Sequence, residues 1–253
     1  MNIMVTGGAG FIGTNLIKRL LKDGHNVVSL DNYSTGKEEN HQEGCNYVDA
    51  DIRDVIDFDY FMKDVDVVYH LAALARIQPS FKNPANTLEV GILGTMNILE
   101  WIKEKENKPR VVFAGSSSVH SGKMKNPYTF SKVVADDLCL LYKKHFGVDV
   151  SICRFYNVYG PHQLTEGEYC TVVGIFENQY ENKEPLTITG DGFQRRDFTH
   201  IDDIVDGLIL TSENETCWDE IELGRGNNHS INELADMFNT ETTYIDERPG
   251  EAR

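Results

Sequence analysis

Residues 2–13 read Asn-Ile-Met-Val-Thr-Gly-Gly-Ala-Gly-Phe-Ile-Gly, a short apolar run that leads into a turn rich in glycine. The turn matches Gly-x-Gly-x-x-Gly at positions 8, 10 and 13, and Gly-x-x-Gly-x-x-Gly at positions 7, 10 and 13. Glycines at these spacings let the chain turn tightly from a strand into a helix. They also let a pyrophosphate approach the backbone at the positive end of that helix. The stretch therefore predicts a strand–turn–helix unit that binds a dinucleotide.

Strand-like and helix-like patterns alternate over the first 155 residues. This alternation predicts an α/β protein with a Rossmann-type doubly wound parallel sheet. Beyond Tyr159 the elements become shorter. We therefore expect a dinucleotide-binding domain over residues 1–158 and a small C-terminal substrate-binding lobe over residues 159–253, and leave open whether parts of the lobe return to the sheet. The expected strands are Asn2–Thr6, Asn26–Asp31, Cys45–Asp49, Val67–His70, Val111–Gly115 and Val150–Phe155, and the expected helices are Phe11–Asp23, Pro84–Glu106 and Tyr128–Phe146.

The composition excludes several classes of function. The formal net charge is −16, and such a surface repels nucleic-acid phosphates and anionic lipids, so we expect neither as a partner. The start of the chain lacks the basic region and long apolar stretch of a signal peptide. The 5 cysteines contain no Cys-x-x-Cys pair, which favours free thiols in a reducing compartment over a metal site. These features predict a cytoplasmic protein without a bound metal.

Asp31 indicates which dinucleotide binds. It ends the second expected strand, 18 residues after Gly13. A carboxylate at this position accepts hydrogen bonds from the adenosine ribose hydroxyls and repels a 2′-phosphate. The sequence therefore predicts NAD rather than NADP.

Tyr128 and Lys132 form the candidate reaction centre. They stand four residues apart in an expected helix, so their side chains share one face. Ser116 follows an expected strand twelve residues upstream. A tyrosine with an ordinary pKa of about 10 becomes a useful base only when a fixed cation favours its phenolate. We therefore interpret Tyr128 as the base, Lys132 as its cation, and Ser116 as the group that holds the substrate oxygen.

Longer motifs follow one another in an order that resembles a known family. The chain is similar to extended short-chain dehydrogenases/reductases of the NAD-dependent nucleotide-sugar epimerase/dehydratase family, and most of all to uridine diphosphate (UDP)-sugar 4-epimerases of the UDP-glucose type. The motifs that carry the resemblance are Thr6–Gly13, Asp31–Gly36, Asp51–Asp54, His70–Ala73, the set Ser116, Tyr128 and Lys132, Arg154–Pro161, Gly190–Gly192, Arg196–Phe198 and Arg248–Glu251.

The resemblance implies roles for individual residues. Ser116, Tyr128 and Lys132 are the implied catalytic set, and Lys132 also binds the nicotinamide ribose. The implied NAD contacts are Gly7, Gly10, Phe11, Ile12, Asp31, Asn32, Ser34, Thr35, Gly36, Asp51, Ile52, Leu71, Ala72, Ala73, Tyr128, Lys132 and Phe155. The implied contacts to a nucleotide-sugar substrate, with UDP expected as the nucleotide, are Arg76, Ser117, Asn157, Thr187, Thr189, Arg196, Arg248 and Glu251.

The residues after Ser116 favour one reaction within the family. Dehydratases and decarboxylases of the family place an acidic residue there, whereas this chain has Ser117 and Ser118. Epimerisation at C4 needs no such acid, because the proton of the C4 hydroxyl goes to Tyr128 and the C4 hydride passes to NAD and returns. The expected activity is therefore a 4-epimerase. A net nucleotide-sugar reductase or dehydrogenase and a non-catalytic NAD-binding protein stay open as alternatives.

The chain also departs from the family pattern. Gly91 stands where the family usually has Asn, Thr189 replaces a usual aromatic residue, and the connection from Ser116 to Tyr128 is short. Arg76 has two readings, a surface arginine or a contact to a carboxylate or hydroxyl of the sugar. By analogy with the family, the helices at residues 84–106 and 128–146 are expected to form a homodimer interface.

Overall fold

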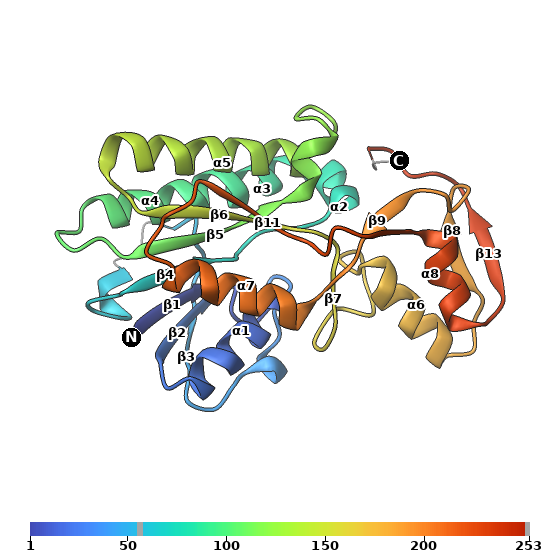
Figure 1. The fold of residues 1–253 in the computed structure, drawn as a ribbon, viewed down its shortest axis with the longest axis horizontal. Helices are drawn as coiled ribbons and strands as arrows, with labels where there is room; N and C mark the ends of the chain where they lie inside the picture. Colours follow the sequence, from blue (N-terminus) through green and yellow to red (C-terminus); the bar gives the residue numbers. More distant parts are fainter. Residues whose placement is uncertain (55–57, 251–253) are drawn as a thin grey trace.

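The computed structural model describes residues 1–54 and 58–250. Its centre is a 7-stranded sheet with the order β11-β6-β5-β4-β1-β2-β3, in which neighbouring strands run parallel (Figure 1). From β1 the chain adds β2 and β3 on one side, and it then adds β4, β5 and β6 on the other side. This reversal of strand order between β1 and β4 is typical of the doubly wound sheets that bind dinucleotides. This confirms the predicted fold class. The strands are β1 (Asn2–Thr6), β2 (Asn26–Asp31), β3 (Asn46–Asp49), β4 (Val67–His70), β5 (Arg110–Ser116), β6 (Val150–Phe155) and β11 (Glu220–Leu223).

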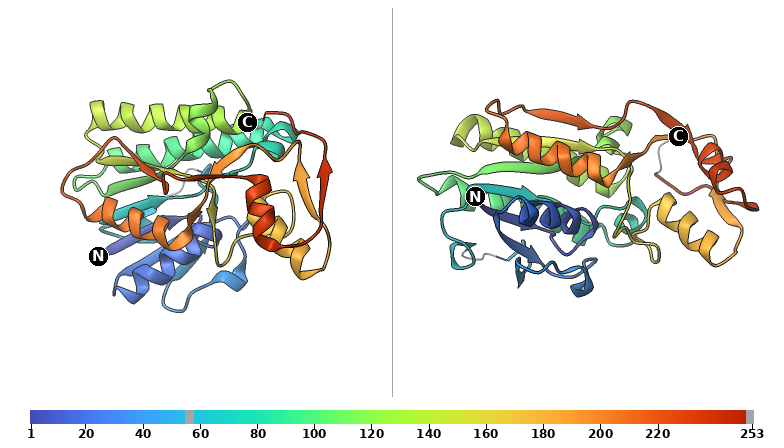
Figure 2. Two further views of the ribbon diagram at one scale, coloured as in Figure 1. Left: turned by 45° about the vertical axis from the view of Figure 1, so that its right-hand side comes forward. Right: turned by 60° about the horizontal axis from the view of Figure 1, so that its bottom comes forward.

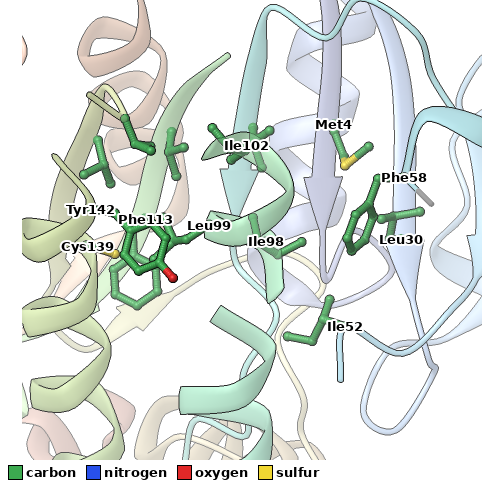
Figure 3. Packing of buried hydrophobic residues seen from close by; sticks show 14 of the residues in the cluster. Met4, Leu30, Ile52, Phe58, Ile98, Leu99, Ile102, Phe113, Cys139 and Tyr142 are labelled. Carbon is green, nitrogen blue, oxygen red and sulfur yellow. The ribbon is translucent and has the colours of Figure 1, made fainter. Parts of the chain in front are cut away.

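Helices cover both faces of this sheet (Figure 2). One face packs against η3 (Glu89–Gly94), α4 (Thr95–Lys103) and α5 (Pro127–Phe146), and α3 (Pro84–Leu88) packs against α5. The other face packs against α1 (Phe11–Lys22) and α7 (Ile201–Glu213). Figure 3 shows part of the first core, where apolar side chains from the helices gather above the strands; its labelled residues include Ile98, Leu99, Phe113, Cys139 and Tyr142.

A smaller group of elements lies at the right of Figure 1 and has a core of its own, built from Phe176, Leu186, Ile188, Ile231 and Ala235. Its elements are α6 (Val172–Glu181), β8 (Leu186–Thr189), α8 (Ile231–Phe238) and β13 (Thr242–Ile245). Two short ladders connect it to the sheet region, β7 (Val158–Tyr159) with β10 (Thr199–His200), and β9 (Arg195–Asp197) with β12 (Asn228–Ser230). The remaining short helices are η1 (Glu38–Asn40), η2 (Phe58–Tyr60), α2 (Ile77–Lys82) and η4 (Ser117–Ser121).

Two elements from the second half of the chain return to the central sheet. Strand β11 pairs with β6 at its edge, and α7 packs on the face that α1 also covers. The sequence analysis did not decide whether parts of residues 159–253 join the central sheet; β11 and α7 do. The division of the chain at residue 158 stays a prediction.

The expected helix at residues 84–106 is the main difference from the sequence-based elements. The segment is helical, but its middle, η3, is a π-helix between α3 and α4. A Cβ on Gly91 would lie 2.9 Å from the Cβ of Ser131, and a Cβ on Gly94 would lie 2.5 Å from Cδ1 of Ile52. The two glycines therefore let this segment approach α5 and the loop after β3 more closely than another residue would allow.

None of the helices described for residues 1–54 and 58–250 has the length and apolar character that crossing a membrane requires.

Candidate active site

A pocket lies at the carboxyl ends of the central strands, where open α/β sheets bind ligands. It is lined by the turn after β1, the ends of β2 and β5, the segments after β3 and β4, and the start of α5. Most of the predicted NAD contacts meet there: Gly7, Gly10, Phe11, Ile12, Asp31, Asn32, Ser34, Thr35, Asp51, Ile52, Leu71, Ala72, Ala73, Tyr128, Lys132 and Phe155.

The glycine turn is shaped for a close approach of a ligand. Gly7 has φ +74°, and a Cβ there would lie 2.9 Å from the backbone of Ala72. Gly10 is the N-cap of α1, and no side chain caps the amides of the first helical turn. Those amides and the positive end of the helix dipole suit a pyrophosphate.

Asp31 is held rigidly at the end of β2. The amide of Ala9 donates to its Oδ2 at 2.9 Å, and the amide of Tyr33 donates to its Oδ1 at 2.9 Å. Burial raises the pKa of Asp31, and the two backbone donors oppose that rise. Gly36 lies outside the pocket wall, but a Cβ on it would come within 2.9 Å of Asp31 Oδ1. Gly36 therefore leaves room for the carboxylate.

Asp51 lies on the same side of the pocket. The Arg53 side chain donates to it twice, from Nε to Oδ1 at 2.9 Å and from Nη2 to Oδ2 at 2.6 Å. The Arg53 amide also donates to Oδ1 at 2.9 Å, and Asn32 Nδ2 donates to Oδ2 at 2.8 Å. These donors, Arg53 first, hold the pKa of Asp51 far below its usual range. Asp51 therefore stays an acceptor throughout the physiological pH range.

His70 is a packed residue, as the sequence favoured. Its ring lies between the hydroxyls of Thr6, at 2.7 Å from Nδ1, and Thr95, at 3.0 Å from Nε2. Burial, and then the charge of Lys132, lowers the pKa of His70 to about 3. The imidazole is therefore neutral at physiological pH.

Tyr128 lines the pocket, and Ser116 follows the lining residues Ala114 and Gly115 without lining the pocket itself; the two side chains interact directly. Ser116 ends β5, and its Oγ accepts from the amide of Ser118 at 3.2 Å and donates to the Ser118 Oγ at 3.0 Å. Asn126 caps α5 through the amide of Thr129 at 2.7 Å, which fixes the first turn that carries Tyr128. Burial raises the pKa of Tyr128, whereas a hydrogen bond with Ser116 and the charge of Arg76 lower it.

Lys132 lies one turn further along α5 and is buried. Its Nζ donates to the carbonyl of Ala114 at 2.8 Å and lies 4.9 Å from the ring centroid of Phe113. Burial lowers the pKa of Lys132 to about 8, and the charge of Asp136 opposes that change. Asp136 in turn forms an ion pair with Arg154 at 2.7 Å. The cation whose charge acts on Tyr128 in this structure is Arg76; the tuning of Tyr128 by Lys132 stays a prediction.

The predicted substrate residues are spread more widely. Arg76 lines the pocket, and Ser117 starts η4 directly after Ser116. Asn157 has φ +22° and donates from Nδ2 to the carbonyl of Asp197 at 3.1 Å. Neither Ser117 nor Asn157 lines the pocket, and the same holds for Thr187 and Thr189 on β8, Arg196 on β9, and Arg248 beyond β13. Glu251 lies outside the described residues.

The sequence reasoning missed part of the pocket wall. Gln163, Leu164 and Tyr169 close the pocket from the segment between β7 and α6, and the carbonyl of Tyr169 accepts from Arg76 Nε at 2.6 Å. This segment has no periodic pattern, so no sequence signal brought it to the site.

The fold and the pocket together are those of a dinucleotide-binding α/β protein. The chain belongs to the NAD dependent epimerase/dehydratase family, whose model matches residues 3–221. It is an NAD-dependent enzyme of this family.

Relatives from several organisms fit this placement. A Methanocaldococcus jannaschii protein provisionally named UDP-glucose 4-epimerase is 34% identical, over 98% of this chain and 87% of its own. The structure of Thermotoga maritima UDP-glucose 4-epimerase with UDP-glucose has a TM-score of 0.93 at 29% identity and matches 100% of this chain and 88% of its own. That of Bacillus cereus UDP-glucuronic acid 4-epimerase with UDP-glucuronic acid and NAD has a TM-score of 0.90 at 30% identity and matches 99% and 88%.

Relatives that are named for a different reaction have a similar sequence identity to this chain. UDP-glucuronic acid decarboxylases of Xenopus tropicalis and Arabidopsis thaliana are 32–33% identical, and this chain spans 51–59% of their length. Family membership therefore leaves the choice of reaction to the residues of the site.

Proposed function

We propose that the protein is an NAD-dependent nucleotide-sugar 4-epimerase that acts on UDP-hexoses. One observation carries the choice of reaction: the turn that follows Ser116 provides hydroxyls rather than a carboxylate. Ser116 bonds to Ser118 within η4, and the acids among the described residues of the pocket wall are Asp31 and Asp51, at the ends of β2 and β3. Elimination of water needs an acid beside the sugar, whereas exchange of configuration at C4 does not.

The cofactor site fits NAD on the evidence of this chain's own groups. The glycine turn leaves backbone room and free amides for a pyrophosphate, and Asp31 places a carboxylate where a 2′-phosphate would be repelled. NAD, when bound, supplies a hydride acceptor next to the sugar. Phe155, Leu71 and Ala73 line the same pocket as the glycine turn and Tyr128.

The residues at the catalytic end then have distinct tasks. Ser116 and Tyr128 hold the C4 hydroxyl of the sugar between them, and Tyr128 removes its proton as C4 is oxidised. Burial raises the pKa of Tyr128 above its ordinary value and so disfavours the phenolate. A positive charge near the phenol has the opposite effect, and Arg76 provides one. The same phenol returns the proton after the keto sugar has turned its other face to the cofactor site, where bound cofactor would supply the hydride to C4.

The test uses a panel of UDP-sugars with the NAD-loaded protein. We expect proton NMR to show C4 epimers without net NADH, and we expect Tyr128→Phe to lower the rate by about 10²–10⁴-fold. Tyr142→Phe is the matched control, because Tyr142 lies on the same helix and its hydroxyl bonds to Glu100 outside the pocket. Epimerisation undiminished in Tyr128→Phe would contradict the assignment, and stoichiometric NADH would favour a dehydrogenase.

We also propose that the protein forms a homodimer through α4 and α5. Leu93 next to α4, and Leu141 and Phe146 on α5, are large apolar side chains that the single chain leaves exposed. A pair of such helices from each copy would cover them in a four-helix contact. Light scattering after size-exclusion chromatography checks this, since the chain mass is 28.6 kDa.

A further inference from the structure

Arg76 is a cation at the catalytic end of the pocket without an internal counter-ion. Its Nε donates to the carbonyl of Tyr169 at 2.6 Å, and its Nη1 donates to the carbonyl of Ala75 at 2.6 Å. Within residues 1–54 and 58–250 it forms no ion pair. Burial lowers the pKa of Arg76, which shows that the surroundings disfavour its charge. An unpaired, partly buried guanidinium is costly.

The phenol next to Arg76 does not balance this charge. Tyr128 is close enough for the guanidinium to lower its pKa, but burial outweighs that effect and the pKa stays above its ordinary value of 10. Tyr128 is therefore uncharged at rest. The backbone carbonyls fix the guanidinium through Nε and one Nη1 hydrogen, which leaves three N–H groups, one on Nη1 and two on Nη2, for a ligand.

The acidic and the basic residues of the pocket wall lie near different strands of the central sheet. Among the described residues, the acids of the pocket wall are Asp31, which ends β2, and Asp51, which follows β3. The cations are Arg76, which follows β4, and Lys132, whose Nζ donates to Ala114 on β5. The chain as a whole has a net charge of −16. A local excess of positive charge in so acidic a protein indicates a ligand that is anionic at this end of the pocket.

We propose that Arg76 binds a carboxylate carried next to C4 of the sugar, so that the preferred substrates are acidic nucleotide sugars. The proposal rests on the proposed function, because Tyr128 marks the position of C4. In a hexopyranose the diphosphate on C1 lies across the ring from C4, and the substituents of C5 and C3 are its neighbours. A carboxylate there is either C6 of a uronate or part of an acidic ether on C3. Either suits the planar, forked donors of a guanidinium.

Calorimetric titration of the NAD-loaded protein tests this. The acidic ligands are UDP-glucuronate and UDP-N-acetylmuramate, and the neutral partners are UDP-glucose and UDP-N-acetylglucosamine. We expect one acidic ligand to bind about 30-fold more tightly than its neutral partner, as for a desolvated charge pair, and the pair that shows the difference identifies which carboxylate binds. Arg76→Gln should remove this difference. Arg19→Gln, an exposed arginine on α1 that pairs with Asp23 and Asp206, should keep it.

The result that overturns the proposal is equal affinity of the wild-type protein for acidic and neutral ligands, which needs no variant. A loss of affinity in Arg76→Gln that is equal for both kinds of ligand also overturns it. Proton NMR of the same mixtures separates this outcome from that of the proposed function. Arg76-dependent binding of a uronate with release of a UDP-pentose would keep the inference and refute the 4-epimerase. Epimerisation of UDP-glucose without any preference for acidic sugars would do the reverse.

Discussion

Replacing Lys132 by methionine should stabilise the protein while it disables the site. Burial lowers the pKa of Lys132 from its ordinary value of 10.5 to about 8. That difference corresponds to about 3 kcal/mol by which the folded state disfavours the ammonium. Lys132→Met also loses the hydrogen bond to Ala114 and the contact with the Phe113 ring, together worth about 1–2 kcal/mol. The net gain expected at pH 6–7 is about 1–2 kcal/mol in the free energy of unfolding.

The stability difference between Lys132→Met and the wild type should depend on pH, and the pKa of Lys132 determines in which direction it changes. Below pH 8 Lys132 is protonated in both the folded and the unfolded protein, so the wild type bears the full cost. Between pH 8 and 10.5 the folded state has lost the proton and the unfolded state keeps it, so the wild type gains stability as pH rises. The advantage of Lys132→Met should therefore shrink through this window.

Urea unfolding of the NAD-free proteins between pH 6 and 10 measures the difference directly. Lys143→Met is the matched control on the same helix, because Lys143 pairs with Asp219 at 2.7 Å. Burial lowers the pKa of Lys143, but its contacts with Asp219 and Cys217 together outweigh burial and raise it. Lys143→Met should be less stable than the wild type, and it should show no stability advantage that shrinks between pH 8 and 10.5. A Lys132→Met protein less stable than wild type at pH 6, or a difference that does not vary with pH, would refute the reasoning.

Three further predictions follow from the described contacts. Asp31→Asn should weaken NAD binding about tenfold and reduce the preference over NADP, measured by fluorescence titration; unchanged binding of both cofactors would contradict the assigned role. Gly7→Ala should lower the melting temperature more than Gly24→Ala, because both have positive φ but only the Cβ at position 7 meets backbone, at 2.9 Å; equal losses would mean that the close approach is unimportant. Arg154→Met should cost about 3–5 kcal/mol in unfolding free energy, because it leaves Asp136 buried without its cation; the double variant with Asp136→Leu should recover most of it, and no recovery would locate the cost elsewhere.

Much of the first half of the fold could be predicted from the sequence because local patterns determine it. Strands β1, β2, β4 and β6 have the bounds that their apolar runs indicated, since each is a buried parallel strand. The π-helix at η3 could not be predicted in this way. It depends on how closely Gly91 approaches Ser131 on another helix, and a helical period contains no such distance.

The second half depends on pairings between distant segments. Strand β11 is half exposed and follows a turn, and nothing in Glu220–Leu223 says that it pairs with β6. The candidate site likewise has residues that local sequence patterns predict and residues that come together only through contacts between distant segments. The glycine turn and Asp31 are read from spacing, whereas the approach of Arg76 to Tyr169 and Tyr128 arises only when three segments meet at the pocket.

The most direct test of the proposed function follows the hydrogen at C4. UDP-sugars that carry deuterium at C4 are incubated with the NAD-loaded protein in ordinary water, and the C4 epimer is analysed by NMR and mass spectrometry. Transient oxidation within a closed site predicts an epimer that keeps its deuterium at C4, with no net NADH. An epimer that has exchanged the deuterium for solvent hydrogen, or a product that is not a C4 epimer, would contradict the account.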